Sequence, residues 1–392
     1  MSTLTMQQPS VYSSFEKARY KFRDELKKGI KPVDSRQPIP DELAKTMVQE
    51  LIDLEVPKNA LIGIFDAFLI LSTHLKEAEY TNLVLLENSH KNLTNTQEKY
   101  YNNIRNVCEN SGIKYYVPTM NNYDRCNMKF DVIIGNPPYQ FGIKSSGNTI
   151  WDKFVSQSLE LLNDGGILSF INPPRWRQPE DNLSYIYKKY QLISLKINDV
   201  KTGKKVFNAM TPFDVYTIKK VKPYTKTYIE FSDGICGSYN VNEMPFIPNS
   251  SINFWLRAFE SKEEKLSAIW TYSHDPRHKH VFMESTKPSS AIYPLTHTFT
   301  KNGFTKRYTT KKHEYQEVSK VIFGDSGSFN PIFDEGTYGC TQHSIFIPVS
   351  DKIEGNKIID FLTKNKNIID SITFSQRQFG PKPLNFIPKS FL

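Results

Sequence analysis

The sequence predicts an α/β protein with a doubly wound, mostly parallel sheet, followed by a smaller and irregular α+β domain. Up to about residue 220, short apolar runs alternate with amphipathic helical segments, a pattern typical of parallel sheets covered by helices. Beyond that point, Pro, Gly, Ser and Asn interrupt short aromatic stretches. The 392 residues, 39% of them hydrophobic, suffice for two cores. We expect an N-terminal helical segment over 1–55 that packs on a catalytic domain over 56–235, and a second domain over 236–392.

The individual elements follow from periodicity and from helix-start and turn signals. A helix beginning at Asp41 has Pro40 before it and acidic residues in its first turn, which favour a helix N-terminus. Helices are expected at 14–30, 41–54, 65–75, 94–110 and 150–162. Strands are expected at 60–64, 82–86, 114–117, 130–134 and 167–171.

Charge and cysteine content restrict the class of protein. Fifty Lys and Arg against 41 Asp and Glu give a net charge of +9, which favours a polyanionic partner such as nucleic acid. The four cysteines are widely spaced without a Cys-x-x-Cys pair, which argues against a disulfide framework or a cysteine zinc site. No apolar run reaches about 18 residues, so we expect no membrane span and a cytoplasmic protein.

The run FDVIIGNPPYQ at 130–140 carries the clearest chemistry. An apolar strand ending at Gly135 would deliver Asn136, Pro137, Pro138 and Tyr139 to the carboxyl edge of the sheet, where ligands bind in open α/β sheets. An amide oxygen and a rigid proline carbonyl can accept both protons of an exocyclic amine, and the tyrosine can stack on a base. The competing interpretation is a proline-rich turn in which Tyr139 only packs.

Three runs together resemble a known family. FDVIIGNPPY, WDKFVSQSLELL and NDGGILSFINPPRW are similar to gamma-class N6-adenine DNA methyltransferases of type II and type IIG restriction–modification systems. The resemblance implies a Rossmann-like class I methyltransferase domain, S-adenosylmethionine as cofactor, and double-stranded DNA from which an adenine is flipped. It also implies that a target-recognition domain follows, and it leaves open a second methyltransferase-like or restriction subunit as a further partner.

The same resemblance assigns roles to further residues. Phe207 stands where the family has a second aromatic against the flipped base, although a core phenylalanine is an equal interpretation. Pro40, Phe65, Glu87 and Asn136 match positions that contact the cofactor, with Glu87 at a strand end where the family binds the ribose hydroxyls.

The glycine-rich cofactor loop departs from the family pattern. In LIGIFDAFLI, Gly63 falls on the acidic position and Leu69 on a glycine, and Asp66 is the nearest carboxylate. Two classes therefore stay open: an active adenine methyltransferase with a divergent pocket, which we favour, and an inactive methyltransferase-like DNA-binding or scaffolding subunit or anti-restriction decoy. Methylation of RNA or of a protein glutamine also uses such a motif, but the long region after it argues against both.

The C-terminal region contains candidates for DNA contacts. The basic run KNGFTKRYTTKK at 301–312 holds Lys306, Arg307 and Lys311 beside aromatic residues, and Arg377 follows in the tail. Cations bind phosphates, and Arg can also read base edges, so these four are predicted to bind DNA. A solvated hairpin is the alternative. The histidines of HDPRHKH are interrupted by Pro276, so no metal site is predicted.

Overall fold

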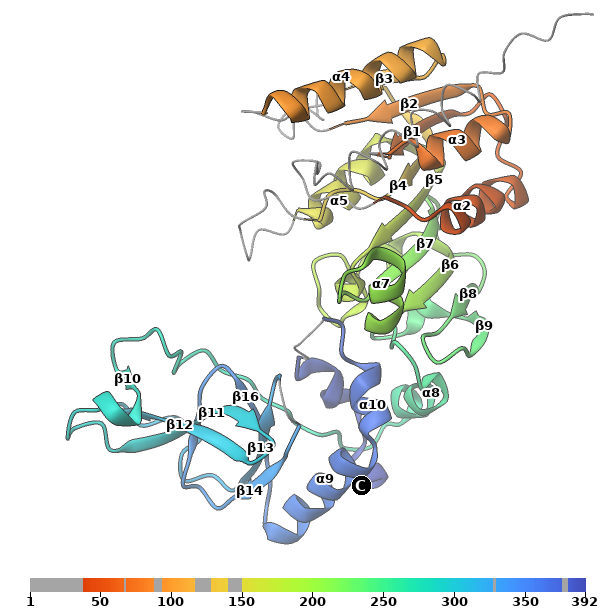
Figure 1. Ribbon diagram of the computed structural model, residues 1–392. Coiled ribbons are helices and arrows are strands. Elements are labelled where there is room, and N and C mark those ends of the chain that lie inside the picture. Colours follow the sequence, from red (N-terminus) through yellow and green to blue (C-terminus); the bar gives the residue numbers. More distant parts are fainter. Residues whose placement is uncertain are drawn as a thin grey trace, which may run out of the picture. The chain divides into compact units, whose positions relative to one another are not determined.

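The chain forms two compact units. The computed structural model describes residues 38–66, 68–87, 94–116, 128–139, 150–326, 329–375 and 380–392, and the helix expected at 14–30 lies outside these ranges. The first unit comprises residues up to 173, 185–230 and 236–242, and the second comprises 174–184, 231–235 and 243–392 (Figure 1). The main division falls at 242/243, where the sequence predicts 235/236. The segments 174–184 and 231–235 precede this division but belong to the second unit.

A nine-stranded sheet forms the centre of the first unit. Its order is β3-β2-β1-β4-β5-β7-β6-β8-β9. Strands β1 to β5 are parallel, and β7 is inserted antiparallel between β5 and β6. The strands are β1 (Leu61–Phe65), β2 (Asn82–Leu86), β3 (Lys114–Tyr116), β4 (Phe130–Gly135), β5 (Leu162–Asn172), β6 (Gln191–Asn198), β7 (Phe213–Lys219), β8 (Thr227–Glu230) and β9 (Cys236–Tyr239). The helices are α2 (Asp41–Asp53), α3 (Ile70–Glu77), α4 (Asn95–Asn110), α5 (Trp151–Leu161), α6 (Ile186–Lys189) and α7 (Val200–Phe207). This arrangement confirms the predicted fold class.

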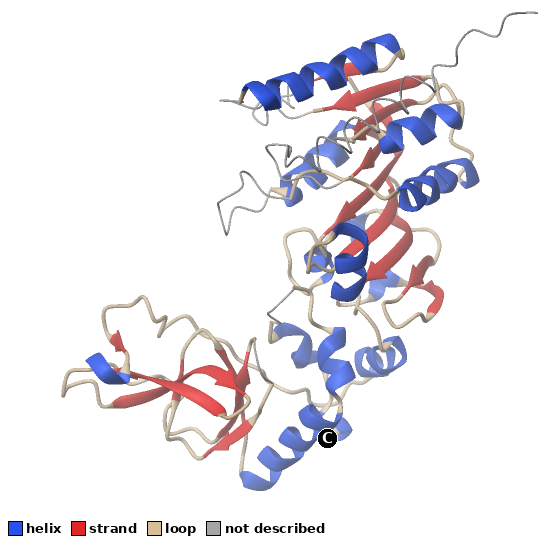
Figure 2. Cartoon of the chain, in the orientation of Figure 1, coloured by secondary structure: helices blue, strands red, loops and turns tan. Residues whose placement is uncertain are grey.

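Helices cover both faces of the parallel strands (Figure 2). Ile62 and Ile64 belong to one apolar core with buried residues of α2, α3 and α4. Phe65 follows Ile64 and points to the opposite face of the sheet, where its ring packs against Phe154 of α5. Because both faces are buried, each strand is a continuous apolar run, which is why the short runs predicted the strands so well.

Two predicted boundaries are wrong. The strand expected at 167–171 begins five residues earlier, because β5 runs from Leu162 to Asn172. The helix expected at 65–75 begins at Ile70, because Phe65 ends strand β1 and the chain then turns. Leu69 adopts a left-handed conformation with φ 57° immediately before the helix. That conformation is costly for a residue with a side chain, and apolar periodicity cannot reveal it.

The second unit is an irregular α+β structure, as predicted. Its strands form a four-stranded sheet, β10-β12-β11-β15, and a three-stranded sheet, β14-β13-β16. The strands are β10 (Val281–Phe282), β11 (Tyr293–Thr300), β12 (Gly303–Thr309), β13 (Lys320–Gly324), β14 (Ile332–Asp334), β15 (Gly339–Cys340) and β16 (Ser344–Pro348), and the helices are α8 (Ile252–Glu260), α9 (Lys352–Lys364) and α10 (Lys366–Ser371). An apolar core around Phe246 and Trp255 joins β13 and β16 to these helices. Within the described ranges, no helix has the length and apolar character needed to cross a membrane.

Candidate active site at the carboxyl edge of the parallel sheet

The ends of β1 and β4 approach each other closely. The Asn136 backbone N–H donates to the Phe65 carbonyl over 3.0 Å. Gly135 has φ +143°, and a β-carbon on it would lie 2.2 Å from the same carbonyl oxygen. Only glycine fits this position, because both the backbone conformation and the space exclude a side chain. The glycine therefore sets the point at which the chain leaves β4 and enters the Asn-Pro-Pro-Tyr turn.

Replacing Gly135 by alanine is expected to lower the unfolding free energy of the first unit by more than about 2 kcal/mol, since it adds a backbone clash to a strained φ. Chemical denaturation followed by circular dichroism measures this loss. Gly112, in the turn after α4, has φ +68° with no atom within 4 Å of the added carbon, so Gly112→Ala serves as the control for backbone strain alone. Equal losses in the two variants would contradict the close approach.

The four residues of the predicted motif occupy the turn after β4. Asn136, Pro137 and Pro138 are buried, and Tyr139 is half-buried. The Tyr139 hydroxyl donates to the Ile171 carbonyl at the end of β5 over 3.0 Å. Burial, and secondarily the charge of Asp214, raises the pKa of Tyr139, so its hydroxyl stays protonated as a donor. The turn is thereby fixed to both neighbouring strands, β1 and β5.

Phe207 lies at the last residue of α7, which precedes β7. Its half-buried ring packs edge-on against Phe213, the first residue of β7, with ring centroids 4.9 Å apart. Because β7 runs antiparallel to β5, its first residue lies at the edge where the parallel strands end. Phe207 therefore lies at the predicted edge of the sheet, and its role against a base remains a prediction.

Two of the residues predicted to contact the cofactor, Glu87 and Pro40, lie next to different elements, β2 and α2. Glu87 directly follows β2 and is 1% exposed, and its backbone N–H donates to the Tyr116 carbonyl. Pro40 precedes α2, whose first residue, Asp41, contacts His74 of α3 over 3.0 Å. A buried carboxylate at a strand end has the chemistry to accept hydrogen bonds from a ribose diol.

The residues around the end of β1 lie differently from what the alignment with the family's glycine-rich loop suggested. Gly63 lies in the middle of β1, and Asp66 is the residue that follows the strand. The Asp66 carboxylate accepts from the Ser72 backbone N–H at 2.8 Å and the Ser72 hydroxyl at 2.9 Å. A carboxylate does stand at the strand end, where it fixes the loop and the first turn of α3. The Leu69 side chain, at the position where the family has a glycine, is buried in the apolar core.

The predicted contact between the Phe65 ring and the cofactor is not supported. The ring is 2% exposed and packs edge-on against Phe154 and Phe170, with centroids 5.5 and 5.7 Å away. Phe65 acts instead through its carbonyl, which receives the Asn136 N–H. A role of Phe65 in cofactor binding stays a prediction.

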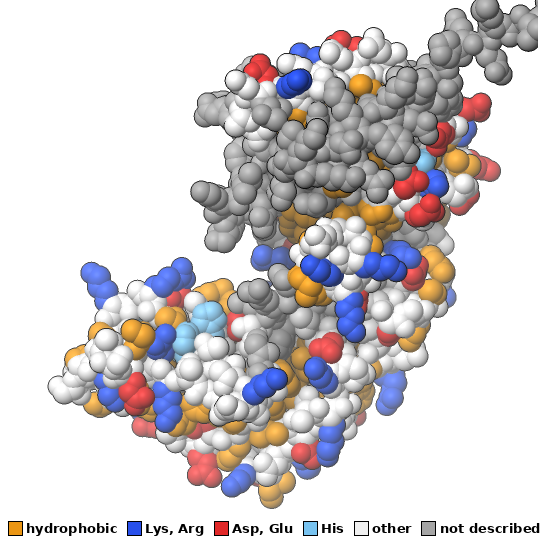
Figure 3. Space-filling view, viewed as in Figure 1, with side chains coloured by type: hydrophobic (Ala, Val, Ile, Leu, Met, Phe, Trp, Pro, Cys, Tyr) orange, Lys and Arg blue, Asp and Glu red, His pale blue; other side chains and the backbone are white. Residues whose placement is uncertain are grey.

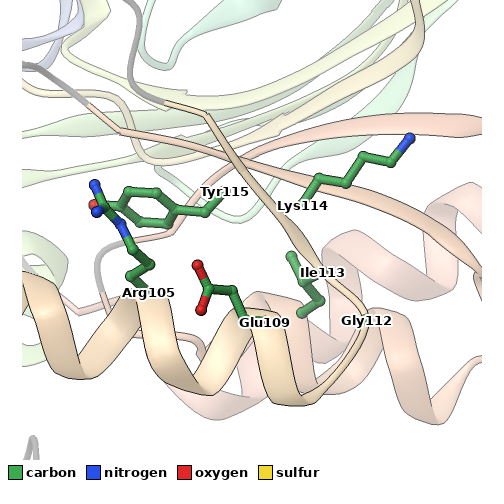
Figure 4. A pocket seen from close by; sticks show the side chains of 6 residues that line it. All are labelled: Arg105, Glu109, Gly112, Ile113, Lys114 and Tyr115. Carbon is green, nitrogen blue, oxygen red and sulfur yellow. The ribbon is translucent and has the colours of Figure 1, made fainter.

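An open groove at the outer edge of the sheet is a separate feature. It is lined by the end of α4 and by β3, with the Arg105 guanidinium 5.1 Å from the centre of the Tyr115 ring and Glu109 nearby (Figure 4). In the sheet order, β2 and β1 separate β3 from β4. We therefore place the candidate site at the ends of β1, β2 and β4 on chemical grounds, and not at this groove.

The predicted DNA-binding cations of the second unit do not share one face. Lys306 and Arg307 are neighbours on β12, so their side chains point to opposite sides of the sheet. Lys306 is exposed and lies over the Tyr338 ring, whereas Arg307 is half-buried. Lys311 is exposed after the strand, and Arg377 lies outside the described residues. Lys and Arg side chains are exposed on this unit, next to a group of histidines (Figure 3).

The histidines of the second unit pack against one another and against polar groups. His274, His280 and His313 have ring centroids about 5 Å apart, 5.3 and 4.9 Å from His274 to the other two. The His274 ring bonds the Lys311 carbonyl, and His313 bonds the Thr271 hydroxyl. Across the described ranges, no group of three or more His, Cys, Asp or Glu side chains is arranged to hold a metal ion.

Two histidines of the second unit, His297 and His313, predict that this unit is sensitive to acid. Burial lowers the pKa of His297 and of His313 to about 4, with further lowering by the charge of Arg307 at His297. Between about pH 6.5 and about pH 4 the unfolded chain therefore binds more protons than the folded chain, and the unfolding free energy falls as the pH falls. Urea unfolding at pH 7.5 and pH 5 measures this. A His297→Gln/His313→Gln variant should show a flatter pH dependence, and an unchanged slope would contradict the assignment.

The part of the chain that contains this edge is similar to known methyltransferases. Residues 62–207, from β1 to the end of α7, match the model of the Eco57I restriction-modification methylase family. The comparison with curated proteins found no match.

Several solved structures are distantly similar. A putative class I S-adenosylmethionine-dependent methyltransferase from Listeria monocytogenes is 12% identical with a TM-score of 0.42, over 58% of this chain and 74% of its own. A modification subunit of a putative type I restriction enzyme from Vibrio vulnificus YJ016 is 11% identical with a TM-score of 0.39, over 57% and 53%. The type IIG restriction endonuclease BpuSI is 11% identical with a TM-score of 0.40, over 90% of this chain and 58% of its own. The chain thus spans little more than half the length of the last two.

The family match covers β1, β2 and β4, the strands that carry the candidate site. The resemblance drawn from the sequence is therefore confirmed over residues 62–207, which match a restriction-modification methylase model.

Proposed function

We propose that the chain is a site-specific DNA methyltransferase that transfers a methyl group from S-adenosylmethionine to N6 of an adenine flipped out of duplex DNA. The observation that carries this proposal is the Asn136–Tyr139 turn. It stands at the carboxyl end of β4, it is bonded to the ends of β1 and β5, and it lies within the segment that matches the methylase family.

The residues at this edge fit the cofactor. Glu87 would bind the ribose hydroxyls, and the backbone of the loop that Asp66 fixes would face the methionine end. When bound, the cofactor supplies an electrophilic methyl on a sulfonium. These roles for Glu87 and the loop rest on the chemistry of a carboxylate and of backbone N–H groups at adjoining strand ends.

The chain's own residues would prepare the amine. The Asn136 side-chain oxygen and the Pro137 carbonyl would each accept one N6–H, which draws the nitrogen lone pair out of the adenine ring and toward the methyl. Tyr139, with Phe207 as second aromatic, would stack on the flipped base and offset part of the unstacking free energy. The proton released from N6 after transfer would pass to solvent. Double-stranded DNA is thus the proposed partner, and the candidate contacts are Lys306, Arg307, Lys311 and Arg377. A second methyltransferase-like or restriction subunit is a further proposed partner.

Calorimetry with S-adenosylmethionine tests the cofactor half of this proposal. We expect micromolar binding, weakened about tenfold or more by Glu87→Ala, because the charged hydrogen bonds to the ribose would be lost. Absence of binding, both alone and with a duplex pool, would contradict the proposal and favour a methyltransferase-like DNA-binding subunit.

A further inference from the structure

The sequence contains Asn-Pro-Pro twice, and the fold brings the two copies to adjacent strand ends. The first, Asn136–Pro138, follows β4, and the second begins at Asn172, the last residue of β5. Strands β4 and β5 are parallel neighbours in which Gly135 pairs with Phe170. The two asparagines therefore leave the same edge of the sheet, one residue out of step.

A hydrogen bond links the residue after the first copy, Tyr139, to the residue before the second, Ile171. The Tyr139 hydroxyl donates to the carbonyl of Ile171, the residue directly before Asn172. Asn172 precedes Pro173, which restricts the backbone of Asn172 to extended conformations. The acceptor that orients the Tyr139 ring is consequently held on a stiff segment.

The Asn172 side chain is itself held from the next strand. It is fully buried, and its side-chain oxygen accepts from the Tyr216 hydroxyl over 2.8 Å. Asp214, also fully buried, lies directly opposite Asn172 in the β5–β7 ladder. Burial, and secondarily the charge of Asp214, raises the pKa of both Tyr139 and Tyr216, which keeps both phenols as donors.

We propose that Asn172, anchored by Tyr216, is a positioning residue that orients Tyr139 for stacking on the flipped base. The inference rests on the proposed function and deepens it. In this inference, the second Asn-Pro-Pro copy holds the Tyr139 ring in one orientation before the base binds. A ring held in place before the base arrives loses less conformational entropy on binding.

The test removes one hydroxyl group. Tyr216→Phe deletes the bond to Asn172 and leaves the ring in place. The matched control is Tyr80→Phe: Tyr80 is 1% exposed in the same unit, and its hydroxyl has no hydrogen-bond partner among the described residues. We expect Tyr216→Phe to lower kcat about two- to tenfold with KM for DNA nearly unchanged, the range that follows from one hydrogen bond. Tyr80→Phe should change neither constant.

A second readout needs neither DNA nor cofactor. In protein labelled with 3-fluorotyrosine, the Tyr139 resonance is assigned by its loss in Tyr139→Phe. We expect this resonance to shift in Tyr216→Phe and to stay in place in Tyr80→Phe. An unshifted resonance, or a kcat in Tyr216→Phe equal to that of the control, would overturn the positioning role. If the wild-type protein methylates nothing while the resonance shifts, the proposed function fails and the coupling of the cluster to Tyr139 stands.

Discussion

Replacing Asn136 by alanine is expected to lower the rate of methyl transfer about a hundred- to a thousandfold, while affinity for duplex DNA changes little. The side-chain oxygen of Asn136 is the one acceptor of the turn that a substitution can remove, since the Pro137 acceptor is a backbone carbonyl. Loss of one preorganised group that acts in the transition state has effects of this size in enzymes. Because Asn136 is buried, with 5% of its surface exposed, we expect the loss to appear in kcat and not in the dissociation constant.

Single-turnover kinetics and fluorescence anisotropy measure the two quantities in the same preparation. Asn110→Ala, at the exposed end of α4, is the matched control and should leave both unchanged. Activity of Asn136→Ala within a few-fold of the wild type would remove the mechanism, even if the fold remained intact.

The largest expected effect on stability is in the second unit. Lys320→Met should lower the unfolding free energy by about 3–5 kcal/mol, because Lys320 and Asp334 form a buried ion pair at 2.8 Å with side chains 0% and 3% exposed. The ammonium also donates to the Tyr315 and Val318 carbonyls, each over 2.9 Å. Removing it leaves a buried carboxylate without its counter-charge.

Urea unfolding followed by tryptophan fluorescence measures this loss. The control is Lys364→Met, which removes an exposed ion pair with Asp360 and should cost less than about 0.5 kcal/mol. The double variant Lys320→Met/Asp334→Leu should recover part of the stability, because no unpaired charge is then buried. Equal costs for Lys320→Met and Lys364→Met would show that the buried pair does not hold this unit together.

The strands of the parallel sheet could be predicted because burial on both faces makes each one a short, continuous apolar run. The range 82–86 was predicted to the residue. The Asn136–Tyr139 turn was also accessible, since its chemistry and its place after a strand are both local in sequence. The mostly parallel character of the sheet was predicted, whereas the order of its strands is seen only in the structure.

The remaining features of the site could not be predicted, because they depend on tertiary contacts. Asp66 directly follows β1, and its carboxylate accepts from Ser72 in the first turn of α3, a contact that apolar periodicity does not show. The bond from Tyr216 to Asn172 joins residues 44 positions apart, so no window of sequence contains it. The repeated Asn-Pro-Pro was the visible signal. Only the pairing of β4 with β5 shows that the two copies are neighbours.

The most direct measurement of the central claim is base analysis of DNA after reaction. The full chain is incubated with methyl-labelled S-adenosylmethionine and a duplex pool, and the digested nucleosides are resolved by mass spectrometry. The account predicts label in N6-methyl-2′-deoxyadenosine from duplex DNA, reduced to background in Asn136→Ala. Labelled cytosine, label confined to RNA or protein, or no label at all would contradict the account.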